Sequence, residues 1–359
     1  MAVAKLKIAV LYDVWEEENT PEAVIAEQSG PRQKPSGRKK KEKKDKEDRE
    51  EIFESLTKLG HEPFYHVLDG RSQSLHALAK CGADLVFNLT ESYGGDDTMD
   101  MNIAAYLELL GLPYTGGGPH ALLLAQDKAL AKKMFAFHGI RTPYFATAYR
   151  GNIDHAHDIE FPLIVKPLKE DGSIGIDAES VVKSIKELME RVEYIQNEFD
   201  SPALIEEYIE GRELYAAILG SYESTQVLPL VELDFSKLPN GTPKIASYEV
   251  KFEKGTEAYR LTKSHLAEDL DEKTSTRLRE TAMAAYRAVK LRDYGRIDMR
   301  LTPKGEVYVI EANPNPWLSS KQEFALAAKA SGRSYTQLIS EIVDMAMART
   351  PKQQKTVGT

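Results

Sequence analysis

Four side chains in the C-terminal part of the sequence have the types and the spacing of a metal and phosphate site. Arg296 and Asp298 stand two residues apart on one apolar stretch, and Glu311 and Asn313 stand two apart on the next. Side chains two apart on a strand share a face, so antiparallel pairing would bring two carboxylates and an amide oxygen together beside an arginine. Such an all-oxygen set favours a hard cation, Mg²⁺ or Mn²⁺, that completes its shell with water and nucleotide phosphates.

Arg296 in this arrangement would stabilise the negative charge that develops on a phosphorylated intermediate. The alternative is a cluster of solvated ion pairs on the protein surface. We disfavour it because one face of each strand is polar, whereas Ile297 and Ile310 are expected to be buried.

Two lysines are candidates for binding nucleotide phosphates. Lys128 begins a helix, and Lys166 ends an apolar strand, where an ammonium group is costly unless it faces a charge. The loop after Lys166 contains Gly172 and Ser173, and backbone N–H groups in such a loop can cradle phosphate oxygens. It is neither a Walker A loop nor a dinucleotide fingerprint. A single lysine at a helix start is usually a solvated surface residue. Lys128 therefore supports phosphate binding only together with the other motifs.

Two further segments place charged residues next to strand-like stretches. Residues 203–214 contain two such stretches joined by an acidic hinge, which suits an adenine edge and a ribose as well as an ordinary charged hairpin. Residues 246–251 read as a strand that leads into a loop containing Gly255. This loop would serve as a lid that closes over phosphates and excludes water, although on its own a surface loop is the simpler interpretation.

The elements that must position these residues alternate between strands and helices. We expect strands at residues 8–12, 63–68, 83–89, 163–166, 214–219, 227–233, 246–251, 295–301 and 307–312. We expect helices at residues 49–59, 74–80, 101–110, 184–196, 273–290 and 324–347. At the start of the chain this alternation indicates βαβ units and a parallel sheet.

Breaks in the pattern predict three α/β domains. A glycine run before Pro119 ends a first domain of residues 1–118, and two further domains span residues 119–206 and 207–350. A charged insert near residues 16–50 interrupts the first domain. We interpret it as a solvated loop leading into a helix, and not as a tether for nucleic acid, because its acids and bases are interleaved. The tail 351–359 is expected to be disordered.

The composition excludes several classes of protein. A net charge of -9 argues against a general nucleic-acid binder, and no apolar run approaches the roughly 20 residues of a membrane helix. The single cysteine, Cys81, excludes an internal disulfide framework and a cysteine-based zinc site. The start of the sequence reads as a strand and not as a signal peptide. We therefore expect a cytoplasmic protein without nucleic-acid or membrane partners.

Taken in order, these motifs resemble those of the ATP-grasp ligases, and within them the D-alanine–D-alanine ligase branch. The resemblance covers roughly residues 83–348 and rests on segments 109–117, 127–130, 164–167, 206–213, 296–298 and 311–314. It implies an ATP-grasp fold, in which an N-terminal parallel-sheet domain (pre-ATP-grasp, Rossmann-like) precedes two subdomains that sandwich the nucleotide. It also implies an ATP- and Mg²⁺-dependent carboxylate–amine ligase that forms an amide through an acylphosphate, and, by analogy, a homodimer.

The resemblance assigns a role to each matched residue. Those implied to bind ATP are Lys128 and Lys166 at the phosphates, Gly172 and Ser173 in the loop over them, Glu206, Tyr208 and Ile209 at the adenine, and Glu213 at the ribose. Those implied to bind Mg²⁺ are Asp298, Glu311 and Asn313. Arg296 would stabilise the acylphosphate and the tetrahedral intermediate, and Lys251 would reach the γ-phosphate from the lid.

The departures from the family concern the substrates. Trp317 stands where the family has a glycine, and Gln322-Glu323 replaces a Ser-Leu pair that helps to hold the second amino acid. The family's His-Gly after the third strand is Thr90-Glu91 in this chain. We therefore place Trp317 and Gln322 in a substrate pocket. The substrates are expected to be amino acids or small peptides, either D-alanine or another of this class.

Two other interpretations stay open. A nucleotide-binding regulator that has lost ligation would keep the fold without the chemistry, and the intact lysine and metal set argues against it. A kinase-like enzyme would transfer the phosphate to a hydroxyl acceptor and release a phosphorylated product in place of an amide.

Overall fold

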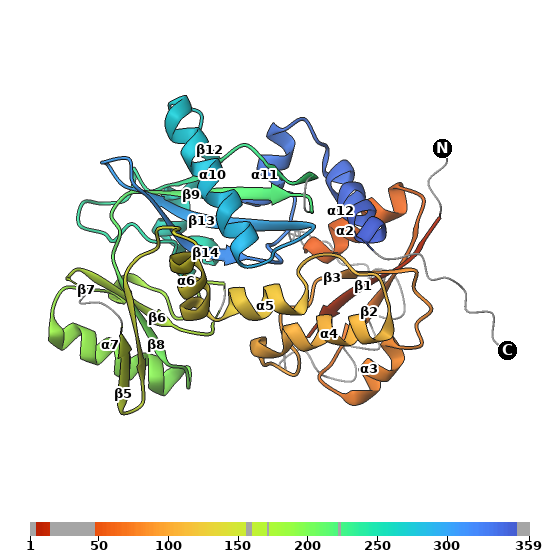
Figure 1. Ribbon diagram of the computed structural model, residues 1–359, viewed down its shortest axis with the longest axis horizontal. Coiled ribbons are helices and arrows are strands. Elements are labelled where there is room, and N and C mark those ends of the chain that lie inside the picture. The colour runs from red at the N-terminus through yellow and green to blue at the C-terminus, as the bar shows by residue number, and fades with distance from the viewer. Residues whose placement is uncertain (1–4, 15–46, 156–159, 171, 222–223, 350–359) are drawn as a thin grey trace, which may run out of the picture. The chain divides into compact units, whose positions relative to one another are not determined.

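The structure is a computed structural model that describes residues 5–14, 47–155, 160–170, 172–221 and 224–349 (Figure 1). Most of the charged insert near residues 16–50 and the whole tail 351–359 lie outside this part of the chain. The chain divides into two compact units. The first comprises residues 1–115, 317–320 and 334–359, and the second comprises residues 116–316 and 321–333.

The first unit is built on a parallel sheet, as predicted. β1 (Lys7–Asp13) lies between β2 (Glu62–Leu68) and β3 (Leu85–Asn88), and both pairs run parallel. Residues 8–11 of β1 are completely buried, as expected for a continuous apolar strand with covered faces. The helices of this unit are α2 (Asp48–Lys58), α3 (Ser72–Leu78), the 3₁₀ turn η2 (Asp97–Met99), α4 (Asp100–Leu110) and α12 (Tyr335–Arg349).

The C-terminal helix α12 belongs to this first unit, whereas the sequence placed residues up to 350 in the last domain. It packs against α2 and β3 (Figure 1), and Arg349 donates a hydrogen bond of 2.6 Å to the carbonyl of Tyr114. The single helix expected at 324–347 is wrong. α11 (Glu323–Ala330) ends before Gly332, whose φ of 88° is left-handed, and α12 begins only at Tyr335.

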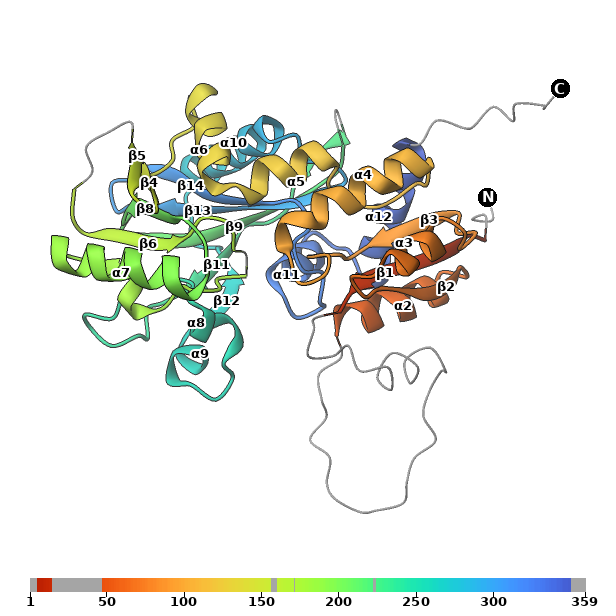
Figure 2. The ribbon, with the colours of Figure 1, turned by 90° about the horizontal axis from the view of Figure 1, so that it is seen from below.

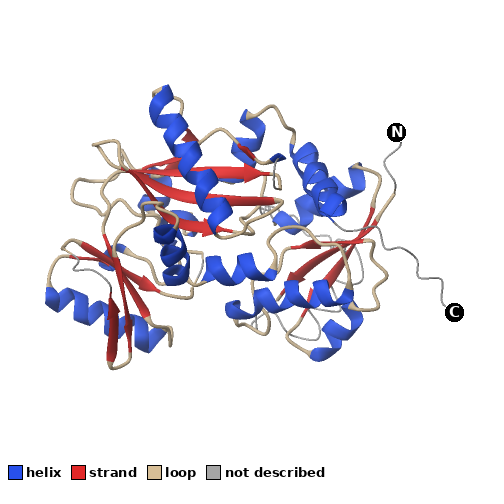
Figure 3. Ribbon diagram, viewed as in Figure 1, coloured by secondary structure: helices blue, strands red, loops and turns tan. Residues whose placement is uncertain are grey.

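The second unit contains two antiparallel sheets (Figure 3). The smaller sheet has the strand order β5-β4-β8-β6-β7. Its strands are β4 (Phe145–Tyr149), β5 (Asn152–His155), β6 (Leu163–Pro167), β7 (Val181–Val182) and β8 (Ala203–Glu207). The 3₁₀ turn η3 (Ala178–Ser180) precedes β7, and α7 (Ile185–Glu198) covers one face of the sheet (Figure 1). Ile195 of α7 lies in one apolar core with Val165 and Ile205 of the sheet.

The larger sheet has the order β12-β11-β9-β13-β14, with β10 beside β9. Its strands are β9 (Arg212–Leu219), β10 (Gln226–Val227), β11 (Val231–Asp234), β12 (Lys263–Leu266), β13 (Tyr294–Leu301) and β14 (Val307–Asn313). The helices α5 (Pro119–Gln126), α6 (Lys128–Phe137) and α10 (Glu272–Ala288) pack against β14. None of the helices in the described ranges is long and apolar enough to span a bilayer.

Residues 248–252 form the helix α8 (Tyr248–Phe252), where the sequence predicted a strand. Ser247 caps this helix, because its Oγ accepts the N–H of Val250 at 3.3 Å. A second short helix, α9 (Glu257–Leu261), follows and is capped in the same way by Thr256. In the view of Figure 2, α8 and α9 are drawn below β12. Local capping therefore outweighs the alternating pattern that favoured a strand.

Candidate functional site

The centre of the candidate site is the strand pair β13–β14. The strands run antiparallel, with Arg296 opposite Asn313 and Asp298 opposite Glu311, which is the pairing considered from the sequence. Residues directly opposite on such a ladder have Cβ atoms about 5 Å apart, so the two carboxylates face one another. Ile297, between the two polar positions of β13, is completely buried as expected.

Each of these carboxylates faces a cation. Arg296 donates two hydrogen bonds to Asp298, from Nε to Oδ1 at 2.7 Å and from Nη2 to Oδ2 at 2.9 Å. Lys128 Nζ lies 3.1 Å from Oε1 of Glu311. Burial raises the pKa of Asp298, and the Glu311 carboxylate adds to the rise, although Arg296 and Lys251 oppose it. Burial also acts to raise the pKa of Glu311, but the nearby lysine ammonium groups, Lys128 first among them, lower it to about 2.

The oxygens of this strand pair suit a divalent cation. Asp298 and Glu311 lie opposite each other on the ladder, and carboxylate oxygens are ligands that a hard divalent cation prefers. Asn313 adds an amide whose buried Nδ2 has no hydrogen-bond partner among the residues that the structure describes. In the described ranges no group of three His, Cys, Asp or Glu side chains is suited to a metal ion. A cation at Asp298, Glu311 and Asn313 would therefore complete its shell with water and phosphate oxygens, as Mg²⁺ does.

Glu206 joins two lysines in the interior of the second unit. Its Oε2 lies 2.9 Å from Nζ of Lys166, and its Oε1 lies 2.6 Å from Nζ of Lys132. All three side chains are almost completely buried. Burial acts to raise the pKa of Glu206, but the two ammonium groups lower it below its usual range. Glu206 thereby fixes the Lys166 ammonium group at the end of β6.

Lys132 is the functional candidate that the sequence analysis missed. Burial lowers the pKa of its ammonium group, although Glu206 opposes this. It also donates a hydrogen bond of 2.9 Å to Thr142 Oγ1 and one of 3.4 Å to the carbonyl of Ile310. The sequence analysis expected Ile310 to be buried, but the residue is half-buried. The sequence feature that could have identified Lys132 is its position four residues after Lys128, on the same face of α6.

The loop of residues 172–176, which we call the glycine loop, is joined to the start of α8. Ser173 has a φ of 65°, and its Oγ donates a hydrogen bond of 2.7 Å to the carbonyl of Ala246. The N–H of Tyr248 donates to the carbonyl of Ile176 at 3.0 Å. The charge of Lys251 on α8 acts to lower the pKa of both Asp298 and Glu311. The structure therefore brings the predicted loop and the predicted lid lysine to the same site.

Arg191 of α7 holds the other end of the glycine loop. Its Nη2 donates hydrogen bonds of 2.8 Å to the carbonyl of Gly175 and to Ser180 Oγ, and it lies 3.0 Å from Asp177 Oδ2. A Cβ at Gly175 would lie 2.7 Å from Pro167 Cγ, so this end of the loop is closely packed. By contrast, a Cβ at Gly172 would meet no atom within 4 Å.

Tyr208 and Ile209 lie in the connection between β8 and β9. These two strands belong to different sheets, so the ordinary charged hairpin considered from the sequence is wrong. Both side chains are half-buried. The Tyr208 hydroxyl accepts a hydrogen bond of 3.1 Å from the N–H of Lys244. This connection therefore links the two sheets of the second unit.

Glu213, the residue expected at the ribose, lies on β9 in a network of polar side chains. Its Oε2 lies 2.7 Å from Nη2 of Arg300, and its Oε1 accepts a hydrogen bond of 2.8 Å from the Tyr215 hydroxyl. The Tyr215 ring in turn lies 5.0 Å from the Arg296 guanidinium. The network thus connects Glu213 to the strand pair.

The two residues expected in a substrate pocket belong to different units. Trp317 lies in the first unit, where its indole N–H donates a hydrogen bond to the Glu91 carboxylate, and the side chain is 42% exposed. In the same unit Glu51 of α2 accepts hydrogen bonds of 2.7 Å from the N–H and Oγ of Ser320. Gln322 lies in the second unit and precedes α11 without forming a side-chain cap.

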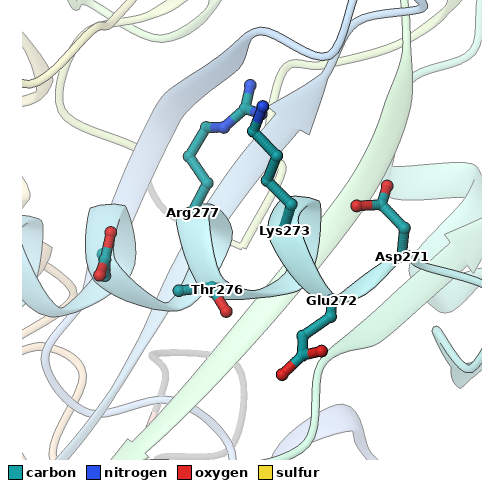
Figure 4. A pocket seen from close by; sticks show the side chains of 6 residues that line it. Asp271, Glu272, Lys273, Thr276 and Arg277 are labelled. Atoms are coloured by element: carbon teal, nitrogen blue, oxygen red, sulfur yellow. The ribbon is translucent and has the colours of Figure 1, made fainter.

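A shallow hollow on α10 lies outside this set of residues. It is lined by residues of the first turns of the helix, including Asp271, Lys273 and Arg277 (Figure 4). Lys273 and Arg277 extend to the same side of the helix in this view. None of the predicted site residues lines it, so it has no part in the site described here.

Comparisons with known proteins relate the chain to one family. The family model described as D-ala D-ala ligase C-terminus matches residues 135–344. The uncharacterised protein y4sG of Sinorhizobium fredii is 35% identical over 265 residues, 74% of this chain and 75% of that protein. The D-alanine–D-alanine ligase of Bordetella petrii is 34% identical over 288 residues, 79% of this chain and 82% of the relative. The crystal structure of D-alanine–D-alanine ligase from Bacillus anthracis complexed with ATP has the same fold, with a TM-score of 0.68 at 22% identity, over 96% of this chain and 98% of that chain.

Proposed function

Because this chain belongs to the D-alanine–D-alanine ligase family, a branch of the ATP-grasp ligases, we propose that it joins a carboxylate to an amine at the expense of ATP. The observation that carries this proposal is the strand pair β13–β14. Its register sets Asp298 opposite Glu311, with Arg296 and Lys128 each in contact with one of the carboxylates. Carboxylates for a cation, lysines for phosphates and an arginine for a developing oxyanion are the parts that phosphoryl and acyl transfer require.

The nucleotide-binding residues are proposed on the same basis. They are Lys128 and Lys166 for the phosphates, Gly172 and Ser173 of the glycine loop for the phosphate oxygens, Glu206, Tyr208 and Ile209 for the adenine, and Glu213 for the ribose. Both lysines are buried beside carboxylates, Glu311 and Glu206. They are thus already directed by these partners before any phosphate is present.

The cation expected in this family is Mg²⁺, and we propose Asp298, Glu311 and Asn313 as the residues that hold it. When bound, it would neutralise phosphate charge and orient the phosphates for transfer. Arg296, once it turns from Asp298, would stabilise the negative charge of the acylphosphate and of the tetrahedral intermediate formed by the attacking amine. Lys251, on α8, would neutralise charge at the transferred phosphoryl group, and the glycine loop joined to α8 would exclude water.

We propose amino acids or small peptides as the substrates. Three of the curated relatives, at 31–34% identity, are named D-alanine–D-alanine ligases, which makes D-alanine one candidate. Trp317, Gln322 and Glu323 differ from the family pattern, which makes another amino acid or a dipeptide the alternative. By family analogy we also propose a homodimer in the cytoplasm, which sedimentation and cell fractionation would test.

The test of the ligase proposal is ATP-dependent hydroxamate formation. Hydroxylamine traps an acylphosphate without needing the natural acceptor, so a panel of D- and L-amino acids and short peptides can be screened as carboxylate donors. ADP release with Mg²⁺ would be measured in parallel, and products identified by mass spectrometry. A hydroxamate with D-alanine and a D-alanyl-D-alanine product would support the family's activity. Hydroxamates from other donors alone would support a changed specificity, and absence of any hydroxamate would contradict a ligase and favour a regulator.

A further inference from the structure

Glu323 is a carboxylate at the candidate reaction centre that the proposed mechanism does not use. It is the first residue of α11, and its Oε1 accepts a hydrogen bond of 2.8 Å from Ser264 Oγ of β12. Its Oε2 lies 4.0 Å from Nη1 of Arg296. Their side chains are 18% and 13% exposed. The carboxylate is therefore directed inward, toward the arginine proposed to stabilise the reaction intermediates.

The arginine consequently faces two carboxylates. Arg296 is held by Asp298 through both of its parallel hydrogen bonds and has Glu323 on its remaining nitrogen. The ring of Tyr215 lies 5.0 Å away, and an aromatic face is also negative. Glu323 thus lies on the Nη1 side of the guanidinium, the side that the bonds to Asp298 do not use. A substrate carboxylate that approached from this side would meet the Glu323 carboxylate in a region with little solvent to screen the repulsion.

The N-terminus of α11 is also unfavourable for a substrate carboxylate. A helix N-terminus carries partial positive charge and attracts anions. Glu323 places a carboxylate of the protein itself in the first turn, so a substrate anion would compete with a group that cannot leave. Gln322, immediately before it, makes no side-chain cap and offers an uncharged amide.

We propose that Glu323 determines the specificity for the acceptor and selects an amine that carries a hydrogen-bond donor or a cation where a free amino acid carries its carboxylate. Amino-acid amides and diamines are the substrate class that fits. The Glu323 carboxylate accepts the donor or pairs with the cation, and it repels a free carboxylate. This inference rests on the proposed ligase function and assigns the acceptor for that same site.

A purely structural role for Glu323 makes a different prediction. An acidic residue in a first helical turn stabilises a helix wherever it occurs, and Glu272 of α10 is such a residue on an exposed surface. If Glu323 served only its helix, Glu323→Gln and Glu272→Gln would each lower stability slightly and leave acceptor choice unchanged. Acceptor choice is therefore the measurement that separates the two roles.

The experiment compares alaninamide with alanine of the same configuration as acceptors, using the carboxylate donor that gives the most hydroxamate. For the unmodified enzyme we expect kcat/KM for the amide to exceed that for the acid by about tenfold or more, a difference of about 1.4 kcal/mol. In Glu323→Gln this ratio should fall about tenfold, mainly through the KM values of the two acceptors. In Glu272→Gln, the matched control, the ratio should stay that of the unmodified enzyme.

Each outcome bears on one of the two proposals. Equal use of the amide and the acid by the unmodified enzyme would overturn the role of Glu323 while the ligase proposal stands, and this result needs no variant to fold. An unchanged ratio in a folded Glu323→Gln enzyme would do the same. Absence of hydroxamate with every donor would overturn the ligase proposal, and the acceptor assignment would fall with it.

Discussion

The strand pair β13–β14 and the glycine loop with α8 both bring charged or phosphate-directed groups to one site, but they are fixed in different ways. In the strand pair, the antiparallel ladder sets the register of Arg296, Asp298, Glu311 and Asn313, and the register shifts only after Asp298. In the loop, Ser173 Oγ donates a hydrogen bond to the carbonyl of Ala246, just before α8, and the N–H of Tyr248 in α8 donates one to the carbonyl of Ile176. The first region is fixed by strand pairing, whereas the second is attached to α8 through individual bonds.

This difference suggests a division of work. Groups that hold a cation need fixed spacing, because Mg²⁺ tolerates little distortion of its shell. A loop and lid that admit a nucleotide must open, and elements with few anchoring bonds are the ones that open most easily. We therefore expect substitutions in the strand pair to affect chemistry and global stability, and substitutions in the loop to affect local opening.

The largest effect is expected from Glu311→Gln in β14. Loss of this carboxylate should lower ATP turnover at least about a thousandfold, because the cation and its phosphate would lose a charged ligand. Steady-state ADP release in the presence of Mg²⁺ measures this. The matched control is Glu306→Gln, which alters an exposed carboxylate paired with Arg141 just before the same strand. Turnover near that of the unmodified enzyme in Glu311→Gln would contradict the metal assignment.

The second expected effect is on stability and comes from Lys132→Met. Removing one cation from the buried Glu206 should cost about 3 kcal/mol, because the carboxylate loses a partner that it cannot replace with water. Urea unfolding measures this cost. Lys133→Met is the control, since Lys133 is exposed and lies 3.7 Å from the exposed Asp154; it should change stability by less than about 1 kcal/mol. Equal costs for the two variants would refute the role given to Lys132.

The pH dependence of the free energy of unfolding should reveal the contribution of the Glu311 carboxylate. Its pKa in the folded chain is about 2, below its ordinary value of 4.5. Its stabilising effect is therefore complete above the ordinary value and is lost as the pH falls toward 2. Linkage gives about 3 kcal/mol near neutral pH, with roughly half lost by about pH 3. Urea unfolding of the unmodified chain and of Glu311→Gln should converge as the pH falls, and a constant difference would argue against this pKa.

In the glycine loop, Gly175→Ala and Gly172→Ala should differ although both glycines have a left-handed backbone. Gly175→Ala should cost about 2 kcal/mol, because its Cβ would press on Pro167 and Phe199. Gly172→Ala should cost about 1 kcal/mol, the price of the backbone conformation alone. Thermal unfolding and the KM for ATP would be measured for both variants. The reverse order of stabilities would contradict the packing described at Gly175.

The smallest expected effect is that of Ser247→Ala, which removes the cap of α8. A cap of this kind contributes about 1 kcal/mol, and here it should act locally. Hydrogen exchange should accelerate at residues 248–252 with little change in global unfolding. Thr256→Ala, which removes the equivalent cap of α9, should accelerate exchange at residues 257–261 instead. If Ser247→Ala left exchange at α8 unchanged, the cap would not be what holds this helix.

The same contrast explains what the sequence predicted. The polar residues of β13 and β14 follow a period of two beside buried residues, and this pattern depends only on near neighbours in the chain. α8 was missed because a helix of five residues depends on one cap at Ser247, while its side chains alternate as in a strand. Lys132 was missed because a lysine on a helix is usually solvated, and its burial arises from Glu206, a distant residue in the sequence.

The sequence could not predict that α12 belongs to the first unit, for a related reason. Its packing partner α2 lies near the other end of the sequence, and no local pattern links the two helices. Gly332 did carry a local signal, since glycine commonly ends helices, but the apolar pattern on both sides of it favoured one continuous helix.

The docking of α12 on α2 also has a consequence for synthesis of the protein. The first unit includes β1, which precedes every element of the second unit in the chain, and α12, which follows them all. The buried face of α12, with Leu338, Ile339 and Ile342, covers the first unit only after nearly the whole described chain has left the ribosome. The second unit contains both sheets of the candidate site, so it can complete its core earlier. The domain encoded first is therefore finished last.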